Sequence, residues 1–171
     1  MATMQDVSLW LYNLTLLPVI FFSVLFLALS LINLLVDKKE KRFKPLADKP
    51  FISVQIPTYN DPIAVRCVQK CMEFDYPRDK YEIIIADDSI NKVTQSMLSN
   101  LAKKNHALIK YVHRDNRNGF KPGALKNAMK YTRGEIIVIF DADWIPAPDF
   151  LRKVIQPFSD PKVAVVQTRQ G

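Results

Sequence analysis

A long stretch without charge near the N-terminus constrains the fold of this chain most strongly. The range Val7–Val36 contains no charged residue, and leucine, isoleucine, valine, phenylalanine and tryptophan dominate it. A transmembrane helix needs about 20 apolar residues, so this stretch can cross a bilayer with some tilt. Pro18 interrupts it only mildly, because helices in lipid tolerate proline. We therefore expect an N-terminal segment, residues 1–36, with one transmembrane helix at about residues 7–36.

A cleaved signal peptide is the alternative interpretation of this stretch. The first six residues carry no lysine or arginine, and Asp6 is acidic. The apolar run is also longer than the ~7–15 residues of a signal-peptide core, and no Ala-x-Ala cleavage site follows it. These features favour a single retained membrane anchor.

The basic residues follow the apolar stretch. All 24 lysine and arginine residues lie after Val36, in a chain of net charge +7, and the densest run is 38–44. By the positive-inside rule, this run predicts a cytoplasmic C-terminal part, with residues 37–50 as a basic juxtamembrane linker. Because the run abuts the membrane, we assign the charge to anionic lipid and an acidic substrate, and we expect no nucleic-acid partner.

Cys67 and Cys71 are the two cysteines of the chain. Their spacing places them one helical turn apart, and no further cysteine or nearby histidine completes a zinc site. A cytoplasmic setting also argues against a disulfide. We expect both to be small buried hydrophobic residues.

Apolar runs alternate with helical patterns from residue 51 onward. We predict strands at 51–56, 81–86, 108–112, 135–140 and 163–168. We predict helices at 62–74, 92–105, 122–132 and 148–157. Because the strands are nearly continuous apolar runs, this order predicts an α/β fold with a mostly parallel sheet and flanking helices. Ligands bind such sheets beyond the carboxyl ends of the strands.

Asp141 and Asp143 follow one of these strands directly, separated by a single alanine. Mg²⁺ prefers oxygen ligands and often uses one or two carboxylates together with substrate phosphates. A divalent ion, Mg²⁺ or Mn²⁺, would offset the charge of a diphosphate as it leaves. The alternative is that one aspartate caps the following turn and the other is solvated.

Asp87 and Asp88 form a second acidic pair at the end of another strand. Adjacent carboxylates repel each other, so they need a positive or hydrogen-bonding partner. One of them could accept a hydrogen bond from a nucleotide base. The alternative is simple capping of the helix at 92–105.

Lys121 lies in the segment 118–123, which contains two of the four glycines and begins a helix. A helix N-terminus together with a lysine suits a phosphate; the alternative is an exposed loop lysine. Neither the dinucleotide fingerprint G-x-G-x-x-G nor a P-loop occurs in the chain. Phosphate binding must therefore depend on a metal and this lysine.

Taken in order, these motifs resemble an inverting family-2 glycosyltransferase of the cellulose-synthase-like branch. The matching stretches are VQIPTYN at 54–60, ADDS at 86–89, RDNRNGFKPGALK at 114–126, IFDAD at 139–143 and VVQTR at 165–169. The RDNRNG segment is especially similar to mannan- and glucan-synthase-like members. The resemblance covers residues 51–171 and implies a nucleotide-sugar-binding domain with a glycosyltransferase A-type fold.

The resemblance also implies roles for the residues in these motifs. The implied donor-binding set is Thr58, Tyr59, Asp87, Asp88, Lys121 and Asp141, and the implied metal ligands are Asp143 and Asp141. The threonine and tyrosine flank the base, one aspartate of the adjacent pair accepts from it, and the lysine contacts nucleotide or phosphate. The implied donor is a UDP- or GDP-hexose, and the acceptor is a glycan or a lipid-linked glycan. Inverting transfer would give a β-linkage in a polysaccharide or glycoconjugate.

Two departures from the family pattern stand out. Asp61 replaces the glutamate that usually follows the Tyr-Asn pair, and no Asp or Glu follows Asp160. Inversion needs a general base. We expect that base beyond Gly171, so that no catalytic residue is visible and the domain is truncated at its C-terminus.

Two other readings compete with a glycosyltransferase fragment. A catalytically inactive, membrane-tethered donor-binding or regulatory remnant would also lack the base. A haloacid-dehalogenase-like phosphatase would use the aspartates of 140–143, but in that class the motif follows an early strand, which disfavours this reading.

Overall fold

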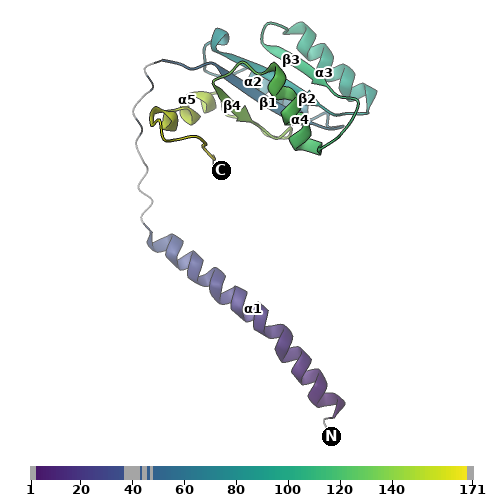
Figure 1. Ribbon diagram of the computed structural model, residues 1–171, viewed down its shortest axis with the longest axis vertical. Helices are drawn as coiled ribbons and strands as arrows, with labels where there is room; N and C mark the ends of the chain where they lie inside the picture. The colour runs from purple at the N-terminus through teal and green to yellow at the C-terminus, as the bar shows by residue number, and fades with distance from the viewer. Residues whose placement is uncertain (1–2, 37–42, 44–45, 47, 169–171) are drawn as a thin grey trace. The chain divides into compact units, whose positions relative to one another are not determined.

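The computed structural model describes residues 3–36, 43, 46 and 48–168 (Figure 1). The contacts divide the chain into two compact units, Met1–Arg42 and Phe43–Gly171. Most of the predicted basic linker, including residues 37–42, lies outside the described residues.

The first unit contains one long helix, α1 (Met4–Leu35). It begins before the predicted boundary because Thr3 and Asp6 form a capping box, in which the Asp6 carboxylate accepts from the Thr3 N–H at 2.8 Å. No side chain of α1 is buried. Among the described residues, this is the one helix long and apolar enough to cross a membrane. So large an apolar surface marks a site of membrane or protein contact.

The second unit is built on a four-stranded parallel sheet. Its strands are β1 (Ile52–Thr58), β2 (Tyr81–Asp87), β3 (Ile109–His113) and β4 (Ile136–Ile139), in the order β3-β2-β1-β4. Every residue of β1 and β2 is buried, which agrees with the continuous apolar runs in the sequence. The predicted parallel α/β sheet is confirmed.

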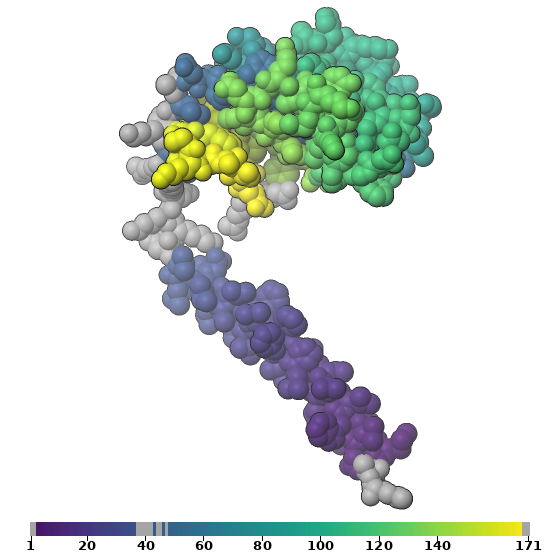
Figure 2. All heavy atoms as spheres, viewed as in Figure 1, coloured from purple at the N-terminus to yellow at the C-terminus, as the bar shows by residue number. Residues whose placement is uncertain are grey.

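Helices cover both faces of this sheet. The larger core includes side chains from α2 (Ala64–Cys71), α3 (Lys92–Lys104) and α5 (Phe150–Val154). On the opposite face, α4 (Phe120–Ala128) packs against Ile84 and Ala86 of β2. The green residues of α4 are prominent on the face shown in Figure 2.

The two cysteines lie in α2, and both are buried and free, as the sequence predicts. The hydrogen bond between its thiol and Cys67, together with burial, raises the pKa of Cys71. Both cysteines therefore contribute to packing, and Cys71 is not a reactive thiolate.

The predicted strand at 163–168 is wrong. The structure gives this segment no strand, and Val165 is 83% exposed. A strand is stable only when a neighbour satisfies its backbone groups, and these residues have no ladder partner among the described residues. β4 is therefore an edge of the sheet.

Three predicted helices are shorter than expected, and the first is α2, which spans Ala64–Cys71 instead of 62–74. α4 begins at Phe120 and passes into a 3₁₀ turn at Met129–Tyr131. α5 ends at Val154 and is followed by the 3₁₀ turn Gln156–Ser159. Pro157 lacks the N–H that a continuing helix would need.

A buried carboxylate joins the strands at the amino end of the sheet. Glu82 is 1% exposed and accepts hydrogen bonds from Ser53 Oγ at 2.7 Å and from Arg133 Nε at 2.9 Å. Lys110 Nζ lies 2.8 Å from the same carboxylate. Burial raises the pKa of Glu82, but the hydrogen bonds from Lys110, Ser53 and Arg133 together hold it below its ordinary value.

Candidate functional site

The polar strand ends meet at the carboxyl edge of the sheet. Thr58 at the end of β1 pairs in register with Asp87 of β2, which pairs with His113 of β3. On the other side of β1, the N–H of Phe140 donates to the carbonyl of Gln55 at 3.1 Å. The loop that carries Asp141 therefore begins at this same edge, where parallel sheets bind ligands.

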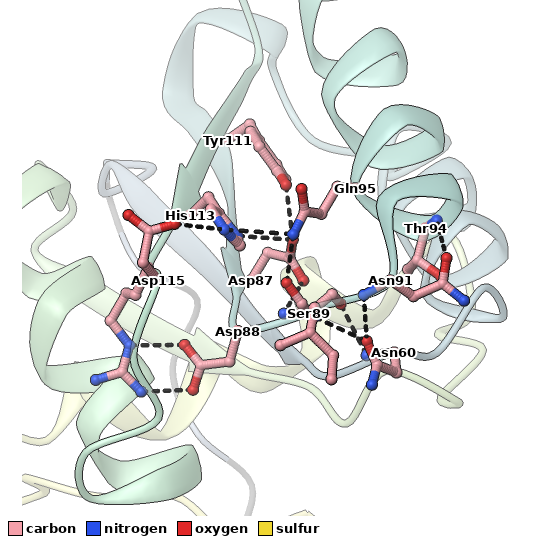
Figure 3. A network of polar contacts seen from close by, with 12 residues as sticks. Asn60, Asp87, Asp88, Ser89, Asn91, Thr94, Gln95, Tyr111, His113 and Asp115 are labelled. Carbon is pink, nitrogen blue, oxygen red and sulfur yellow. Dashed lines mark hydrogen bonds and ion pairs between the residues drawn. The ribbon is translucent and has the colours of Figure 1, made fainter.

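Asp87 is the fully buried carboxylate of this edge (Figure 3). One oxygen accepts the hydroxyl of Tyr111 at 2.6 Å and lies 3.2 Å from His113 Nδ1, and the other accepts the N–H of Ser89 at 3.0 Å. Burial raises the pKa of Tyr111, and the hydrogen bond to Asp87 raises it further. The contacts of Asp87 are internal, so it holds β2, β3 and the following loop together.

Asp88 faces a different partner. Its carboxylate accepts two hydrogen bonds from Arg114, from Nε at 2.6 Å and from Nη2 at 2.5 Å. The same guanidinium donates to the carbonyls of Asn118 at 3.1 Å and Phe120 at 3.2 Å. Arg114 therefore anchors both Asp88 and the turn before α4, in the bidentate geometry that suits arginine.

Neither aspartate caps α3, because Asn91 does so through its side chain. A second asparagine, Asn60, adopts a positive φ of 51°, a conformation that asparagine tolerates better than most residues. Its side-chain oxygen accepts the N–H groups of Ile90 and Asn91, both at 2.9 Å, and its own N–H donates to Ser89 Oγ at 2.7 Å. Asn60 thus joins the loops after β1 and β2 (Figure 3).

A small cavity of about 110 Å³ lies beside these loops. It is lined by Pro57, Thr58, Tyr59, Asp88, Arg117, Lys121 and Ala124. Thr58 is 6% exposed, and its buried hydroxyl has no hydrogen-bond partner in the described part of the chain. The structure thereby brings four of the predicted donor-binding residues to one cavity, and Asp87 is not among its lining residues.

Lys121 connects this cavity to the loop after β4. It lies in the first turn of α4, and its ammonium group is paired with the carboxylate of Asp141. The two side chains are 50% and 57% exposed, so both can exchange partners. The chain turns after Asp141, whose carbonyl accepts the N–H of Trp144 at 3.0 Å and lies 3.6 Å from Cys67 Sγ.

Asp143 is exposed in the same turn, and its carboxylate has no ion pair or hydrogen bond to the described residues. Within residues 3–36 and 48–168, no group of three or more His, Cys, Asp or Glu side chains is arranged to hold a metal. Asp141 and Asp143 alone would therefore supply only part of a coordination sphere. This fits a divalent ion that also takes phosphate oxygens and water.

A wider cavity, about 700 Å³, lies elsewhere, along β4 and the segment 163–168. Its lining is mainly aliphatic and includes none of the predicted donor-binding residues. Its chemistry does not suit a nucleotide diphosphate.

Comparison with known proteins decides the family. The model of the family described as "Glycosyl transferase family 2" matches residues 53–171, which include every residue of the candidate site. The chain belongs to glycosyl transferase family 2.

The relatives of this family 2 chain include polysaccharide synthases. It is 36% identical over 162 residues to glucomannan 4-beta-mannosyltransferase 9 of Arabidopsis thaliana, a match that covers 84% of this chain and 30% of that protein. It is also 36% identical over 124 residues to cellulose synthase 2 of Novacetimonas hansenii, covering 71% and 7%. The chain therefore spans less than a third of the length of these relatives.

A solved structure shares the fold. The mannosyltransferase PcManGT from Pyrobaculum calidifontis, solved in complex with GDP-Man and Mn²⁺, is 34% identical, with a TM-score of 0.66. The match covers 74% of this chain and 37% of that one. The predicted family and the predicted glycosyltransferase A-type fold are both confirmed.

Several residues of the site escaped the sequence analysis. Arg114, Tyr111 and His113 hold the two aspartates, and Arg117 lines the cavity. The sequence does contain a signal that could have predicted these partners. A tyrosine, a histidine and an arginine lie around the end of β3, and the neighbouring strand β2 is the one with two carboxylates at its end. Such carboxylates need partners, and neighbouring strand ends supply them.

Proposed function

We propose that this chain binds a GDP-hexose, GDP-mannose in particular, through a divalent ion, and forms the donor-binding part of a membrane-anchored inverting β-hexosyltransferase. The observation that carries the proposal is the convergence of Thr58, Tyr59, Asp88 and Lys121 on one cavity, with Lys121 in contact with Asp141. The relatives support the sugar and the nucleotide, because mannosyltransferases are prominent among them and PcManGT was solved with GDP-Man and Mn²⁺.

Each side chain has a distinct task in this proposal. Tyr59 and Thr58 border the base, and the fixed carboxylate of Asp88 accepts from its N–H groups. Lys121 leaves Asp141 to contact the diphosphate, with the first turn of α4 behind it. Asp141 and Asp143 hold Mn²⁺ or Mg²⁺, which offsets the negative charge of the departing diphosphate.

The transfer step is proposed for the whole protein. A general base must take the proton of the acceptor hydroxyl, and we place that base outside residues 1–171. The acceptor is proposed to be a glycan, with a β-linked polysaccharide or glycoconjugate as product. We further propose that α1 spans the membrane and that the second unit faces the cytoplasm, since basic residues directly follow the helix.

Calorimetry on the full 171-residue chain in detergent tests the donor site. We expect GDP to bind in the presence of Mn²⁺ and to bind at least tenfold more weakly in EDTA. The Asp143→Ala variant should lose this metal dependence, whereas Asp79→Ala, which removes an exposed carboxylate before the amino end of β2, should keep it. GDP affinity that is equal with and without Mn²⁺ would refute the metal-bound diphosphate.

A further inference from the structure

Two arginines in the segment before α4 have different surroundings. The guanidinium of Arg114 is occupied by contacts within the chain, because it donates hydrogen bonds to Asp88 and to two carbonyl oxygens. Arg117 is exposed, and no hydrogen bond or ion pair joins its guanidinium to the described residues. A planar group with five N–H donors is therefore available for a ligand at this position.

The Arg117 guanidinium lies against an aromatic ring. Its Cζ is 3.3 Å from the centroid of the Tyr59 ring and 5.3 Å from that of Phe120. At the shorter distance the guanidinium sits over the ring face of Tyr59 as a cation–π pair. A base cannot stack directly on that face while the arginine occupies it.

The cavity next to this pair is lined by both hydrogen-bond donors and hydrogen-bond acceptors. Arg117 and Lys121 supply donors, Asp88 supplies carboxylate oxygens, and the buried hydroxyl of Thr58 has no partner among the described residues. A carboxylate has about four lone-pair sites, so Asp88 retains acceptor capacity beside its two bonds from Arg114. An unpartnered buried hydroxyl is costly, which indicates that a ligand group completes the site.

We propose that Arg117 is a base-binding residue, which holds the nucleobase of the donor by stacking it on the guanidinium that Tyr59 supports. Aromatic and guanidinium planes are general stacking surfaces for bases. A guanidinium that stacks on a base directs its in-plane N–H groups away from that base, so the discrimination between bases comes from Asp88, whose carboxylate matches the N1–H and N2–H donors of guanine. This site therefore favours guanine over adenine, because the N1 atom of adenine is an acceptor and would face the Asp88 carboxylate.

The inference rests on the proposed function, since it needs a nucleotide donor in this cavity. A phosphate contact is the competing role for Arg117, because a free guanidinium also binds phosphate. Base stacking and phosphate binding differ in one measurable way. A stacking residue affects guanosine and GDP alike, whereas a phosphate contact affects GDP alone.

The experiment measures GDP binding by calorimetry with Mn²⁺, and guanosine and adenosine by competition against GDP. The variants are Arg117→Ala and Arg117→Lys, where lysine keeps the charge but loses the planar face. Arg152→Ala is the control, because it removes an exposed arginine in α5. The wild-type chain must first bind GDP; if it does not, the proposed function fails rather than this inference.

We expect both Arg117 variants to weaken the binding of GDP and of guanosine by a similar factor, about tenfold, and to weaken adenosine binding as well, because stacking tolerates every base. The control should bind as the wild type does. Weakened GDP binding with unchanged guanosine binding would overturn the proposal in favour of a phosphate contact. Unchanged affinity for both ligands, or full retention by Arg117→Lys, would overturn it as well.

Discussion

Lys121 and Asp141 form an ion pair between the first turn of α4 and the loop after β4. Each side chain is about half exposed. Such a pair contributes about 0–1 kcal/mol, so ligands can separate it at little cost. A phosphate that takes the lysine and a divalent ion that takes the carboxylate would each replace one half of the pair. Under the proposed function, the ion pair would keep the two groups available for a charged donor.

Replacing Lys121 by methionine should have opposite effects on the two ligands. Without its competing cation, Asp141 should bind Mn²⁺ alone up to about fivefold more tightly. GDP should bind about tenfold more weakly in the presence of Mn²⁺, because a charged hydrogen bond is lost. Paramagnetic resonance titration of free Mn²⁺ and calorimetry of GDP measure the two effects.

Lys130→Met is the matched control, since Lys130 is an exposed lysine in the turn after α4. It should leave both affinities unchanged. If Lys121→Met binds GDP as tightly as the wild type, the lysine has no contact with the diphosphate.

The Asp88–Arg114 pair should be important for stability. Asp88 is 4% exposed and Arg114 is 12% exposed at the side chain, so removing the arginine leaves a buried carboxylate unpaired. We expect Arg114→Ala to lower the free energy of unfolding by about 3–5 kcal/mol. Arg114→Lys should lower the free energy of unfolding by a smaller amount, because lysine keeps the charge but lacks the bidentate geometry of the guanidinium.

Urea denaturation monitored by circular dichroism measures these differences. The exposed Arg152 provides the comparison, and Arg152→Ala should cost less than about 0.5 kcal/mol. A change below about 1 kcal/mol for Arg114→Ala would mean that the Asp88 carboxylate finds another partner or becomes solvated.

The sheet and its functional edge were predictable from sequence because of how parallel strands bury both faces. Continuous apolar runs such as 52–56 and 81–86 indicate this burial, and the polar residues that follow them must then lie at one edge. The run 163–168 is mainly apolar as well, yet it forms no strand in the structure. Composition reports the tendency of a segment to pair, whereas pairing itself depends on a neighbour far away in sequence.

The details of the site depend on the direction in which each side chain points, and a sequence motif does not give that direction. Asp87 and Asp88 are adjacent, but one carboxylate contacts Tyr111 and the other contacts Arg114. Successive side chains at a strand end point to opposite faces, so neighbours in sequence acquire different partners. The stacking of Arg117 on Tyr59 joins two separate loops, and only the folded sheet brings them together.

The buried carboxylate of Glu82 should make stability depend on pH. Hydrogen bonds in the folded state hold its pKa below the ordinary value. Its stabilising contribution is therefore fully present above the unfolded pKa of about 4.3 and is lost as the pH falls toward the folded pKa. Glu82→Gln removes this contribution at every pH.

Thermal unfolding between pH 7 and pH 3 measures the effect. The difference in Tm between wild type and Glu82→Gln should be largest near neutral pH and should shrink below about pH 4.3. Glu73→Gln, at an exposed glutamate of a surface ion pair, should show a small difference that hardly changes with pH. A Glu82→Gln difference that stays constant over this range would show that the carboxylate is not held ionised by its partners.

Gly123 should be intolerant of any side chain, because the turn before α4 closes against it. A Cβ atom there would lie 2.0 Å from the carbonyl oxygen of Asn118 and 2.9 Å from Nη1 of Arg114. The first contact is with backbone, so the turn itself must move. Gly123→Ala should therefore displace Lys121 and disturb the Asp88–Arg114 pair, with a lower Tm and GDP affinity reduced at least tenfold.

Gly119 provides an informative comparison in the same turn. It has a positive φ of 74°, but a Cβ atom there would come no closer than 3.3 Å to Gly123. Gly119→Asn should be milder, because asparagine tolerates this conformation and the backbone of Gly123 would need to move by only a few tenths of an ångström. The expected order of Tm and GDP affinity is wild type, then Gly119→Asn, then Gly123→Ala. If Gly123→Ala ranked above Gly119→Asn, backbone conformation rather than the close approach at Gly123 would determine the shape of the turn that presents Lys121 to the donor.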